Sequence, residues 1–410
     1  AYLDRINVGF AALQMNRQLH LSDAAYGFGA GLFFVGYFIF EIPSNLILQR
    51  VGARRWIARI MISWGAIAMS TVLVRGERGF YLLRFLLGVA EAGFFPGIIL
   101  YLTYWFPARE QARAVAAFMT ATALAGVIAG PLSGGLLTMH GVMGLAGWQW
   151  LFLLEGVPAV ILGVAVALHL PDGPMQARWL SHAERLALTN RIAANDAPQA
   201  RARMHNLAPA LTDGRVWLLA ALYFSIVIGL YGVSLWLPQI IKSFGSLSDL
   251  EVGFIAAVPF VVAAVAMVQV GKASDRAGER RWHLALSALV GAIGLAVSAL
   301  AANPVLEMIA ICVGAGGIWG TFGPFWSMPS AFLGGSAAAG GIALINSVGN
   351  LGGLAGPYAV GLIHQSGHGF GGGLMVMASA LLVAAILALC VPRAAVAPPV
   401  ELLQPQRQRG

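Results

Sequence analysis

Long apolar stretches dominate the chain and restrict it to one class of fold. Hydrophobic residues make up 59% of the 410 residues and charged residues 10%, whereas about a quarter of the residues are charged in a typical soluble domain. Most of the apolar stretches are long enough to cross roughly 30 Å of hydrocarbon as α-helices. They lie at residues 1–16, 24–48, 54–74, 79–106, 112–139, 147–170, 215–241, 251–271, 283–302, 305–332, 338–364 and 372–392. We therefore expect an all-α membrane protein with twelve transmembrane helices.

Lys and Arg residues gather on one of the two sets of loops that would lie on opposite sides of a membrane. The formal net charge is +8, and 19 of the 25 basic residues fall on the set that includes the C-terminal stretch, against four on the other set. Cytoplasmic loops carry such an excess. We therefore expect the spans in a bacterial inner membrane with both termini in the cytoplasm, and no nucleic-acid partner. Because the sequence opens at Ala1 inside a span, we also expect further residues before it.

The sequence contains neither a disulfide framework nor a metal-ligand spacing. Its two cysteines, Cys312 and Cys390, fall in apolar spans, where we interpret them as small hydrophobic residues. A membrane-embedded enzyme would need a nucleophile with its base, or a metal cluster. A receptor built like a transporter would carry a large soluble signalling extension. We therefore expect no metal, no cofactor and no catalytic residue.

Two unrelated motifs recur at the same offset of 226 residues. Arg50–Arg55 after the second span matches Arg276–Arg281 after the eighth, and Gly126-x-x-x-Gly130-Pro131 matches Gly352-x-x-x-Gly356-Pro357. The offset predicts two pseudo-symmetric six-helix bundles with a site between them, a common plan of transporters. We expect an N-terminal six-helix bundle at 1–170, a cytoplasmic connector at 171–214, a C-terminal six-helix bundle at 215–392 and a cytoplasmic tail at 393–410.

The repeated motifs indicate gating surfaces and structural turns rather than contacts with substrate. Glycines let helix backbones approach closely, and proline bends a span. Asp275 can pair with nearby arginines or accept hydrogen bonds at a helix end; the equivalent residue of the first half is Gln49, so the pairing must differ there. The residues expected in gating or structural roles are Gly52, Arg54, Arg55, Asp275, Arg276, Gly278, Arg280, Arg281, Gly130 and Pro131.

Four ionisable residues fall inside apolar spans: Asp4 and Arg5 in the first, Arg84 and Glu91 in the fourth. A charge at mid-membrane costs about 2.5–3.5 kcal/mol on the insertion scale, so such groups usually face a partner or a water-filled path. The 226-residue offset maps them onto Leu230, Tyr231, Ala310 and Gly317, none of which is charged. Residues needed for helix packing should recur in both halves, whereas these four charged residues occur in the first half only. We therefore interpret the four charged residues as functional. Static ion pairs that hold helices in register are the alternative.

The charged residues suit the binding of an organic carboxylate together with protons. Arg84 and Glu91 are seven residues apart, so they project from one helix face about 10.5 Å apart along the axis. A guanidinium offers a planar fork of donors to a carboxylate, whereas a buried Asp or Glu can carry a proton. A substrate anion that competes for the arginine would make the carboxylate easier to protonate. This coupling must be reciprocal.

Neutral polar and aromatic residues occupy the corresponding region of the second half. Groups such as Tyr231, Trp326 and Ser327 would orient a small polar molecule, and Asn346 and Asn350 share one helix face. We interpret three other polar sites as follows: Glu41 is structural, at the cytoplasmic end of its span; Glu155 is either functional or an interhelical hydrogen-bond partner; His364 and His368 are solvated loop residues.

Several of these stretches resemble a known family. Gly271–Asp275 followed by Arg276–Arg281 resembles the signature loop of the major facilitator superfamily, and Gly126–Gly135 resembles its span-five motif. Tyr2–Asn7, Arg84–Gly93 and Asn346–Gly353 resemble the anion:cation symporter family. That family includes bacterial galactonate, glucarate, tartrate, phthalate and hydroxyphenylacetate carriers, the vesicular glutamate transporters and sialin. The likeness covers essentially the whole chain, and residues 147–152 and 171–186 look most like the tartrate, phthalate and hydroxyphenylacetate branch.

The resemblance implies roles for individual residues. Asp4 and Glu91 would be the proton-coupling carboxylates, while arginines of the same two spans would bind or gate for the substrate carboxylate. Tyr37, Ser327 and Asn350 match positions that line the pocket of the galactonate carrier. The vesicular members carry an arginine in span seven where Tyr231 and its neighbours are neutral, so glutamate-like or chloride-linked behaviour is not expected. The expected substrate-binding residues are Arg5, Arg84, Tyr37, Ser327, Asn350, Asn346, Trp326 and Tyr231.

We therefore expect a proton-coupled symporter that imports a small organic anion by alternating access. The anion would be a carboxylate such as tartrate, a sugar acid or an aromatic acid. An organic-anion exchanger or a uniporter without proton coupling is the alternative. The partners would be the carboxylate, protons as the coupling ion and the lipid bilayer, and the protein would function as a monomer.

Overall fold

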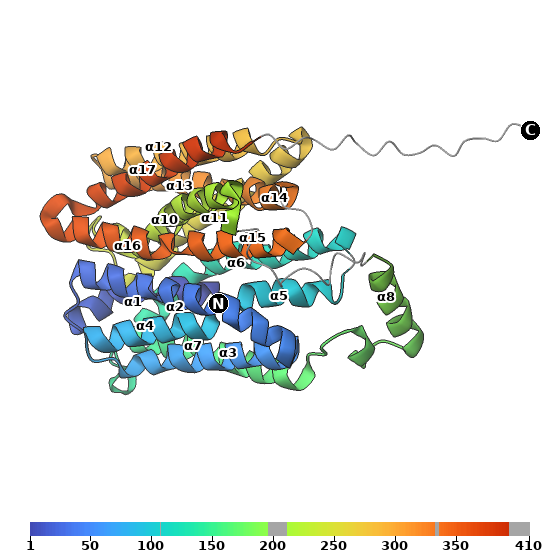
Figure 1. Ribbon diagram of the computed structural model, residues 1–410. Coiled ribbons are helices and arrows are strands. Elements are labelled where there is room, and N and C mark those ends of the chain that lie inside the picture. Colours follow the sequence, from blue (N-terminus) through green and yellow to red (C-terminus); the bar gives the residue numbers. More distant parts are fainter. Residues whose placement is uncertain (107, 196–210, 333–335, 393–410) are drawn as a thin grey trace, which may run out of the picture.

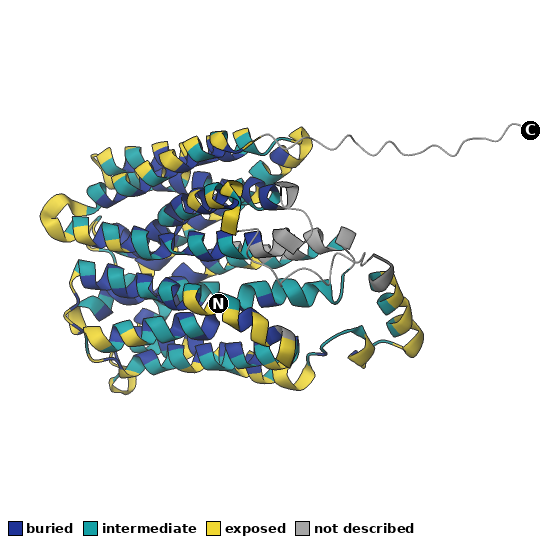
Figure 2. Ribbon diagram, viewed as in Figure 1, coloured by how far each residue is buried: buried dark blue, intermediate teal, exposed yellow. Residues whose placement is uncertain are grey.

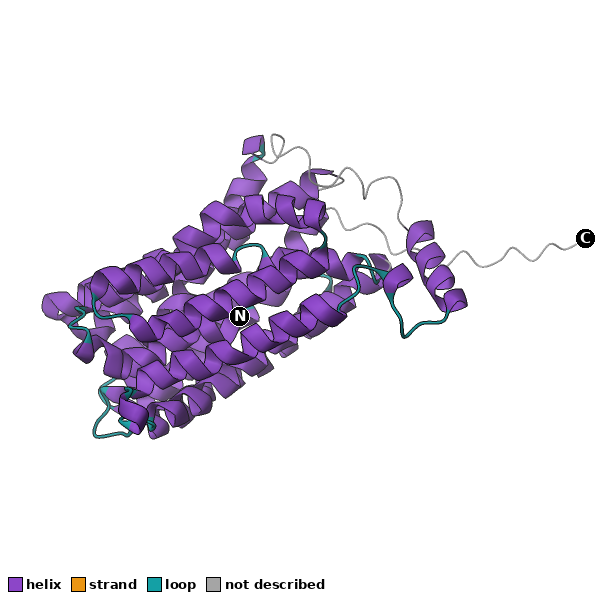
Figure 3. Cartoon of the chain, turned by 90° about the horizontal axis from the view of Figure 1, so that it is seen from below, coloured by secondary structure: helices purple, strands orange, loops and turns teal. Residues whose placement is uncertain are grey.

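The computed structural model describes residues 1–106, 108–195, 211–332 and 336–392. Within these ranges every regular element is a helix, and the long helices lie side by side in one elongated bundle (Figure 3). Nine helical segments of the described chain are long and apolar enough to cross a membrane; one of them, residues 341–390, turns back at His364–His368 and so crosses twice. Helices α1 and α6 complete the twelve crossings, as the apolar stretches predict.

Seven helices make up the first half, because its fourth crossing is divided between two of them. They are α1 (Tyr2–Gln18), α2 (Asp23–Val51), α3 (Ala53–Ser70), α4 (Glu77–Glu91), α5 (Phe94–Thr103), α6 (Ala108–Leu137) and α7 (Gly147–His169). Helix α3 packs on α7, α2 packs on α4, and α1 contacts both α6 and α7. Helix α1 therefore has neighbours on several sides, which places its charged residues in the interior.

Eight helices make up the second half, in which two crossings are divided. They are α10 (Gly214–Lys242), α11 (Asp249–Ala277), α12 (Arg281–Leu300), α13 (Pro304–Gly320), α14 (Phe322–Phe332), α15 (Ser336–Asn350), α16 (Gly352–Ile363) and α17 (Gly369–Cys390). Helix α12 packs on α13 and α17, while α10 contacts α15, α16 and α17. The central place of α10 in this half mirrors that of α1 in the first.

The two ends of the bundle differ in what joins the helices. At one end, here called the connector end, the chain passes through Pro174–Gln176 and α8 (His182–Asn195), which lies beyond the bundle (Figure 1). At the other end, here called the turn end, short connections such as Thr71–Leu73 and Val142–Gly144 join successive helices. The expected tail at 393–410 and residues 196–210 of the expected connector lie outside the described residues.

Three crossings are interrupted where the sequence predicts continuous spans, namely 79–106, 305–332 and 338–364. The interruptions fall at Ala92–Gly93, Thr321 and Leu351, but Thr321 and Leu351 keep right-handed helical backbone angles, so only the first is a true break. At the first, Gly93 adopts φ +83°, a left-handed conformation that glycine tolerates. The hydroxyl of Ser44 on α2 donates to the freed carbonyl of Ala92 at 2.6 Å. Broken spans are stable only where protein or water satisfies the backbone, so α2 stabilises the break directly after Glu91.

Small residues let the two halves approach closely on the side of the turn end. Helix α2 packs on α16, α6 on α11 and α1 on α10. Gly130 of α6 faces the backbone of Gly253 on α11, and Gly27 of α2 faces that of Pro357 on α16, so closely that an added Cβ would overlap it. Such contacts are typical of packed membrane helices. Buried residues concentrate where helices meet, and exposed residues follow the outer faces and both ends (Figure 2).

Candidate functional site

An ion pair joins the first and fourth crossings. The Nε of Arg5 on α1 donates to Oε1 of Glu91 on α4 at 2.7 Å, and Nη2 of Arg5 lies 2.5 Å from the same oxygen. The Glu91 side chain is fully buried and that of Arg5 is 14% exposed. Among the described residues, Oε2 of Glu91 has no hydrogen-bond partner. The pair therefore keeps one carboxylate oxygen that can take a proton or another donor.

Aromatic rings surround the guanidinium of Arg5. Its Cζ lies 4.9 Å from the ring centre of Tyr37 and 5.2 Å from that of Phe33, both on α2. Its Nη1 donates to the hydroxyl of Tyr231 on α10 at 3.3 Å, and the Tyr231 ring lies against Phe34 with centroids 4.3 Å apart. Arg5 is thus contacted by residues of both halves, and each cation–π contact is worth about 0.5–2 kcal/mol.

Arg84 is buried but only partly hydrogen-bonded. Its Nη2 donates to the backbone carbonyl of Ala30 on α2 at 3.1 Å, and its Cζ lies 5.3 Å from the ring centre of Phe33. The residue is 3% exposed, yet neither Nε nor Nη1 has a partner among the described residues. A guanidinium binds carboxylates through such a fork of N–H groups. Arg84 therefore holds two donors that an incoming anion can use.

Close packing of α2 on α4 brings these charges together. Gly36 of α2 faces the backbone of α4, and Gly88 of α4 faces that of α2, and a Cβ at either position would overlap the opposite carbonyl. Arg84 and Glu91 lie within the single helix α4, so the seven-residue spacing keeps them on one face. That face is turned toward α1 and α2, two neighbours that the spacing alone does not predict.

Asp4 does not bond to either arginine. Its Oδ2 accepts from the indole Nε1 of Trp64 on α3 at 3.2 Å, and Oδ1 has no hydrogen-bond partner among the described residues. Successive residues of a helix point about 100° apart, so Asp4 and Arg5 face different neighbours. The two expected proton-coupling carboxylates are therefore held by different helices, Asp4 by α3 and Glu91 by α1.

Glu155 of α7 is an interhelical hydrogen-bond partner, one of the two interpretations that the sequence allows. Its Oε2 accepts from Nδ2 of Asn7 on α1 at 2.8 Å, and its Oε1 accepts from Oγ of Ser133 on α6 at 2.9 Å. All three residues are buried. The carboxylate thus ties three crossings of the first half together.

Glu41 lies deeper than the sequence interpretation places it. It precedes the end of α2 by ten residues and is 1% exposed. Its Oε1 accepts from Nδ2 of Asn346 at 2.6 Å and its Oε2 from Oγ of Ser347 at 2.5 Å, both on α15 of the second half. Asn346, expected to bind substrate, is therefore bonded to a carboxylate of the first half. The signal that points to Glu41 is its spacing, four residues after Tyr37 on the same helix face.

Two other candidates of the second half, Trp326 and Ser327, have contacts within that half. Trp326 of α14 packs edge-on against Tyr223 of α10, with ring centres 5.0 Å apart. The hydroxyl of Ser327 donates to the carbonyl of Pro324 in its own helix at 2.8 Å. Asn350 is 6% exposed at the end of α15. Of the expected binding residues, the structure brings Arg5, Tyr37 and Tyr231 into direct contact, and Arg84 joins them through the shared ring of Phe33.

In the loop motif of the second half, the aspartate pairs with an arginine of the same loop, as its sequence suggests. Asp275 Oδ1 lies 2.6 Å from Nη1 of Arg280, and Gly278 adopts the left-handed φ of +62° that ends α11. Arg281 donates to the backbone carbonyl of Leu389, which ties the loop to the end of α17. Arg276 is exposed.

The loop motif of the first half takes its carboxylate from the connector. Asp172 Oδ1 accepts from the backbone N–H of Arg54 at 2.8 Å, and its Oδ2 lies 4.0 Å from Nε of the same residue. Gly52, with φ +94°, makes the turn between α2 and α3, and Arg55 is exposed. Asp172 therefore satisfies the start of α3, the role for which the motif itself has no acidic residue.

At the turn end, polar side chains join the two halves. His364 bonds through Nδ1 to Asp23 at 2.7 Å and stacks on Phe370, so its interpretation as a solvated loop residue is wrong, whereas His368 is exposed. Gln14 of α1 donates to Asp249 of α11 at 2.8 Å. These bonds add to the glycine contacts and hold the halves together at this end.

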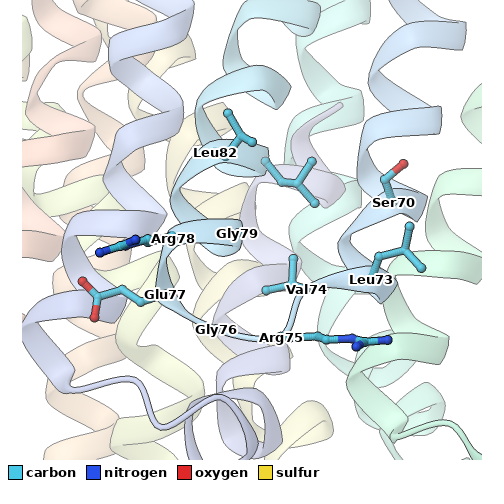
Figure 4. A pocket seen from close by; sticks show the side chains of 10 residues that line it. Ser70, Leu73, Val74, Arg75, Gly76, Glu77, Arg78, Gly79 and Leu82 are labelled. Atoms are coloured by element: carbon cyan, nitrogen blue, oxygen red, sulfur yellow. The ribbon is translucent and has the colours of Figure 1, made fainter.

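A surface cavity of about 780 Å³ lies at the turn end of the bundle. It is lined by the end of α3, the following turn and the start of α4, including Val74, Arg75 and Leu82. Figure 4 shows Arg75 and Arg78 directed to opposite sides of this turn. The lining comes from one continuous segment of the chain and contains none of the expected site residues.

Comparison with known proteins agrees with this architecture. The chain matches the family model described as Major Facilitator Superfamily over residues 1–357 and 246–408. It is 53% identical to a protein of Agrobacterium vitis named "Putative tartrate transporter", covering 96% of this chain and 87% of the relative. It is 44% identical to a protein of Pseudomonas putida named "Putative metabolite transport protein NicT", covering 96% of this chain and 90% of the relative. It is also 44% identical to a protein of Acinetobacter baumannii named "Quinolone resistance transporter", covering 95% and 90%.

Solved structures share the fold at low sequence identity. A bacterial homologue of the human lysosomal transporter Spinster, in an inward-facing and occupied conformation, superposes with a TM-score of 0.77 at 17% identity, covering 96% of this chain and 94% of that one. A D-xylose–proton symporter superposes with a TM-score of 0.74 at 14% identity, covering 96% of both chains. The twelve crossings in two six-helix bundles are the arrangement of these transporters. The chain therefore belongs to the Major Facilitator Superfamily and is a multi-pass membrane transporter rather than an enzyme.

Proposed function

We propose that the protein is a proton-coupled symporter that imports a small organic anion, with a carboxylate group as the feature it recognises. One observation carries the proposal: Nε and Nη1 of the buried Arg84 guanidinium have no hydrogen-bond partner within the described ranges, beside an Arg5–Glu91 ion pair in the membrane interior. Buried charge is expensive, and no counterpart of these residues exists in the second half. A carboxylate is the ligand that such a fork of donors binds best.

The same geometry suggests how substrate and proton are coupled. A carboxylate bound by Arg84 would lie near Arg5 and compete with Glu91 for its guanidinium. Glu91 without its partner takes a proton more readily, because a lone buried carboxylate is costly. By linkage, a proton on Glu91 frees Arg5 and favours substrate binding to the same degree. Asp4, held by Trp64, is the second coupling carboxylate in this scheme.

The relatives support the class of substrate without deciding its identity. The Agrobacterium vitis protein is named for tartrate, a small carboxylate, whereas the Acinetobacter baumannii protein is named for quinolone resistance. Basic residues on alternate loops support a bacterial inner membrane with both chain termini in the cytoplasm. Rocking of the two halves about the central charges would give alternating access, and one chain holds all of the residues proposed here.

Uptake into proteoliposomes tests the proposal. The wild type should accumulate radiolabelled tartrate, or another carboxylate found by a thermal-shift panel, when the outside is more acidic than the inside. Glu91→Gln should lose this accumulation and retain exchange of labelled for unlabelled substrate, while Glu184→Gln, on the exposed helix α8, should behave as the wild type. Equal accumulation by wild type with and without the pH gradient would reject symport and favour an exchanger or uniporter.

A further inference from the structure

Two buried glutamates of the first half each accept hydrogen bonds from the same two types of residue, an asparagine and a serine. Glu155 accepts from an asparagine amide and a serine hydroxyl, Asn7 and Ser133, at 2.8 and 2.9 Å. Glu41 likewise accepts from an asparagine amide and a serine hydroxyl, at 2.6 and 2.5 Å. The donor groups are of the same types at both glutamates, but the donors of Glu155 belong to its own half and those of Glu41 belong to the opposite half.

This difference makes the surroundings of Glu41 depend on the conformation of the transporter. A buried carboxylate without a salt bridge needs hydrogen bonds to both oxygens, because otherwise nothing offsets the free-energy cost of its desolvation. Glu155 keeps its donors whenever the first half moves as a unit. Glu41 loses both donors when α2 and α15 separate, and its carboxylate must then be hydrated or protonated.

The bond lies on the connector side of the Arg5–Glu91 pair. Along α2, Ala30 accepts from Arg84, Tyr37 lies beneath Arg5, and Glu41 follows one turn further toward the connector end. On the turn-end side, the hydroxyl of Tyr26 donates to the carbonyl of Leu235 on α10 at 2.8 Å. Hydrogen bonds between the halves therefore lie on both sides of the charged residues.

Within the described part of the chain, few titratable groups act on Glu41. Arg5 of α1 is the cation that faces it, and Tyr37 of α2 and Tyr223 of α10 are the titratable hydroxyls that do so. On α4, Arg84 and Glu91 are engaged with Ala30 and Arg5. On α3, the guanidinium of Arg59 lies over Trp56 instead. Of the described part of α15, the residues that face Glu41 are the neutral donors Asn346 and Ser347.

We propose that Glu41 is a third coupling carboxylate, which latches the two halves together through Asn346 and Ser347 and takes a proton from the aqueous phase when they part. The latch rests on the proposed function for its role in symport, but its opening can be measured without any transport. Charge-assisted hydrogen bonds are roughly twice as strong as neutral ones. Protonation of Glu41 therefore weakens the latch, and closure of the latch favours release of the proton, by reciprocity.

Distances between spin labels at the connector end test the latch. Arg50 of α2 and Lys272 of α11 are exposed residues of opposite halves, and both can be replaced by cysteine after Cys312→Ala and Cys390→Ala. In the wild type, lowering the pH from about 8 to about 5 should increase the population with long distances, because protonation weakens the bonds. Glu41→Gln should show that larger population at both pH values, with little dependence on pH.

Glu155→Gln is the matched control, because its donors lie within one half. It should keep the distances and the pH response of the wild type. Ser347→Ala removes one donor and should shift the distances part of the way, whereas Ser225→Ala, whose hydroxyl bonds its own helix at 2.9 Å, should not. Ser347→Ala also keeps the test valid if Glu41→Gln does not fold.

The outcomes separate this inference from the proposed function. If Glu41→Gln and Ser347→Ala both keep the wild-type distances and pH response, the latch is rejected, even when the wild type accumulates substrate with protons. If the wild type shows no proton-driven accumulation but these variants shift the distances, the latch stands as a gate and its role in symport is rejected.

Discussion

The guanidinium carbon of Arg5 lies 4.9 Å from the ring centre of Tyr37, and this contact connects α1 to α2 at the ion pair. The ring orients Arg5 so that its nitrogens reach Glu91 on one side and Tyr231 on the other. Arg5 therefore depends on four different helices, counting its own. Its position is sensitive to any motion of α2 relative to α10.

Replacement of Tyr37 separates the ring from its hydroxyl. Tyr37→Phe keeps the aromatic face and should retain substrate affinity within about threefold, whereas Tyr37→Leu should lose roughly 3- to 30-fold, the equivalent of one cation–π contact. Substrate Kd, measured by thermal shift or calorimetry, gives the comparison. Phe40→Leu, on an exposed part of the same helix, is the control. Equal affinity of the Phe and Leu variants would show that the ring does not orient Arg5.

Arg84 should require its forked geometry and not only its charge. Arg84→Lys keeps a cation but offers a point charge in place of the fork of donors at Nε and Nη1, so the affinity for carboxylates should fall about tenfold or more, or about 1.4 kcal/mol. Arg84→Ala should abolish binding. Arg178→Lys, an exposed arginine of the connector, should leave the affinity unchanged. Wild-type affinity in Arg84→Ala would contradict direct recognition of the substrate by this residue.

Sequence patterns predicted the crossings and the common helix face of Arg84 and Glu91. The lengths of the apolar stretches determine the number of crossings, and the seven-residue spacing of Arg84 and Glu91 places both on one helix face. The same periodicity does not say which helix lies opposite that face. For this reason the Trp64 partner of Asp4 and the α15 partners of Glu41 were not predictable from their own segments.

Local breaks in the helices were also beyond the sequence patterns. Apart from Glu91, the residues around Gly93 are apolar, so hydropathy alone favours a continuous span. The break is stable because Ser44, 48 residues earlier in the chain, donates to the carbonyl of Ala92. Similarly, Asp172 replaces the missing acidic residue of the first loop motif from a distance of 118 residues. Both are tertiary contacts between segments that carry no sequence signal for each other.

Removal of the Asp172 carboxylate should loosen the connector end of the first half. Asp172→Ala leaves the N–H of Arg54 without its acceptor at the start of α3, which should cost about 1 kcal/mol and lower the Tm by about 2–4 °C. Asp172→Asn keeps one acceptor oxygen and should lose less. The melting of purified protein in one detergent measures both, with Arg178→Ala, at an exposed position of the connector, as the control. Unchanged melting of Asp172→Ala would show that the start of α3 does not depend on this contact.

Two glycines of the same helix should respond oppositely to an added methyl group. A Cβ at Gly130 would overlap the backbone of Gly253 on α11, whereas a Cβ at Gly135 meets nothing within 4 Å. Gly130→Ala should therefore force α6 and α11 apart at the turn end and lower stability by about 1–3 kcal/mol. Gly135→Ala should be neutral or raise stability by up to about 1 kcal/mol, because alanine favours a helix. Thermal melting, with exchange activity in liposomes as a second readout, gives the comparison. Similar melting of the two variants would mean that close contact at Gly130 does not hold the two halves together, and the turn-end closure would have to rest on the polar bonds of Asp23 and Asp249 instead.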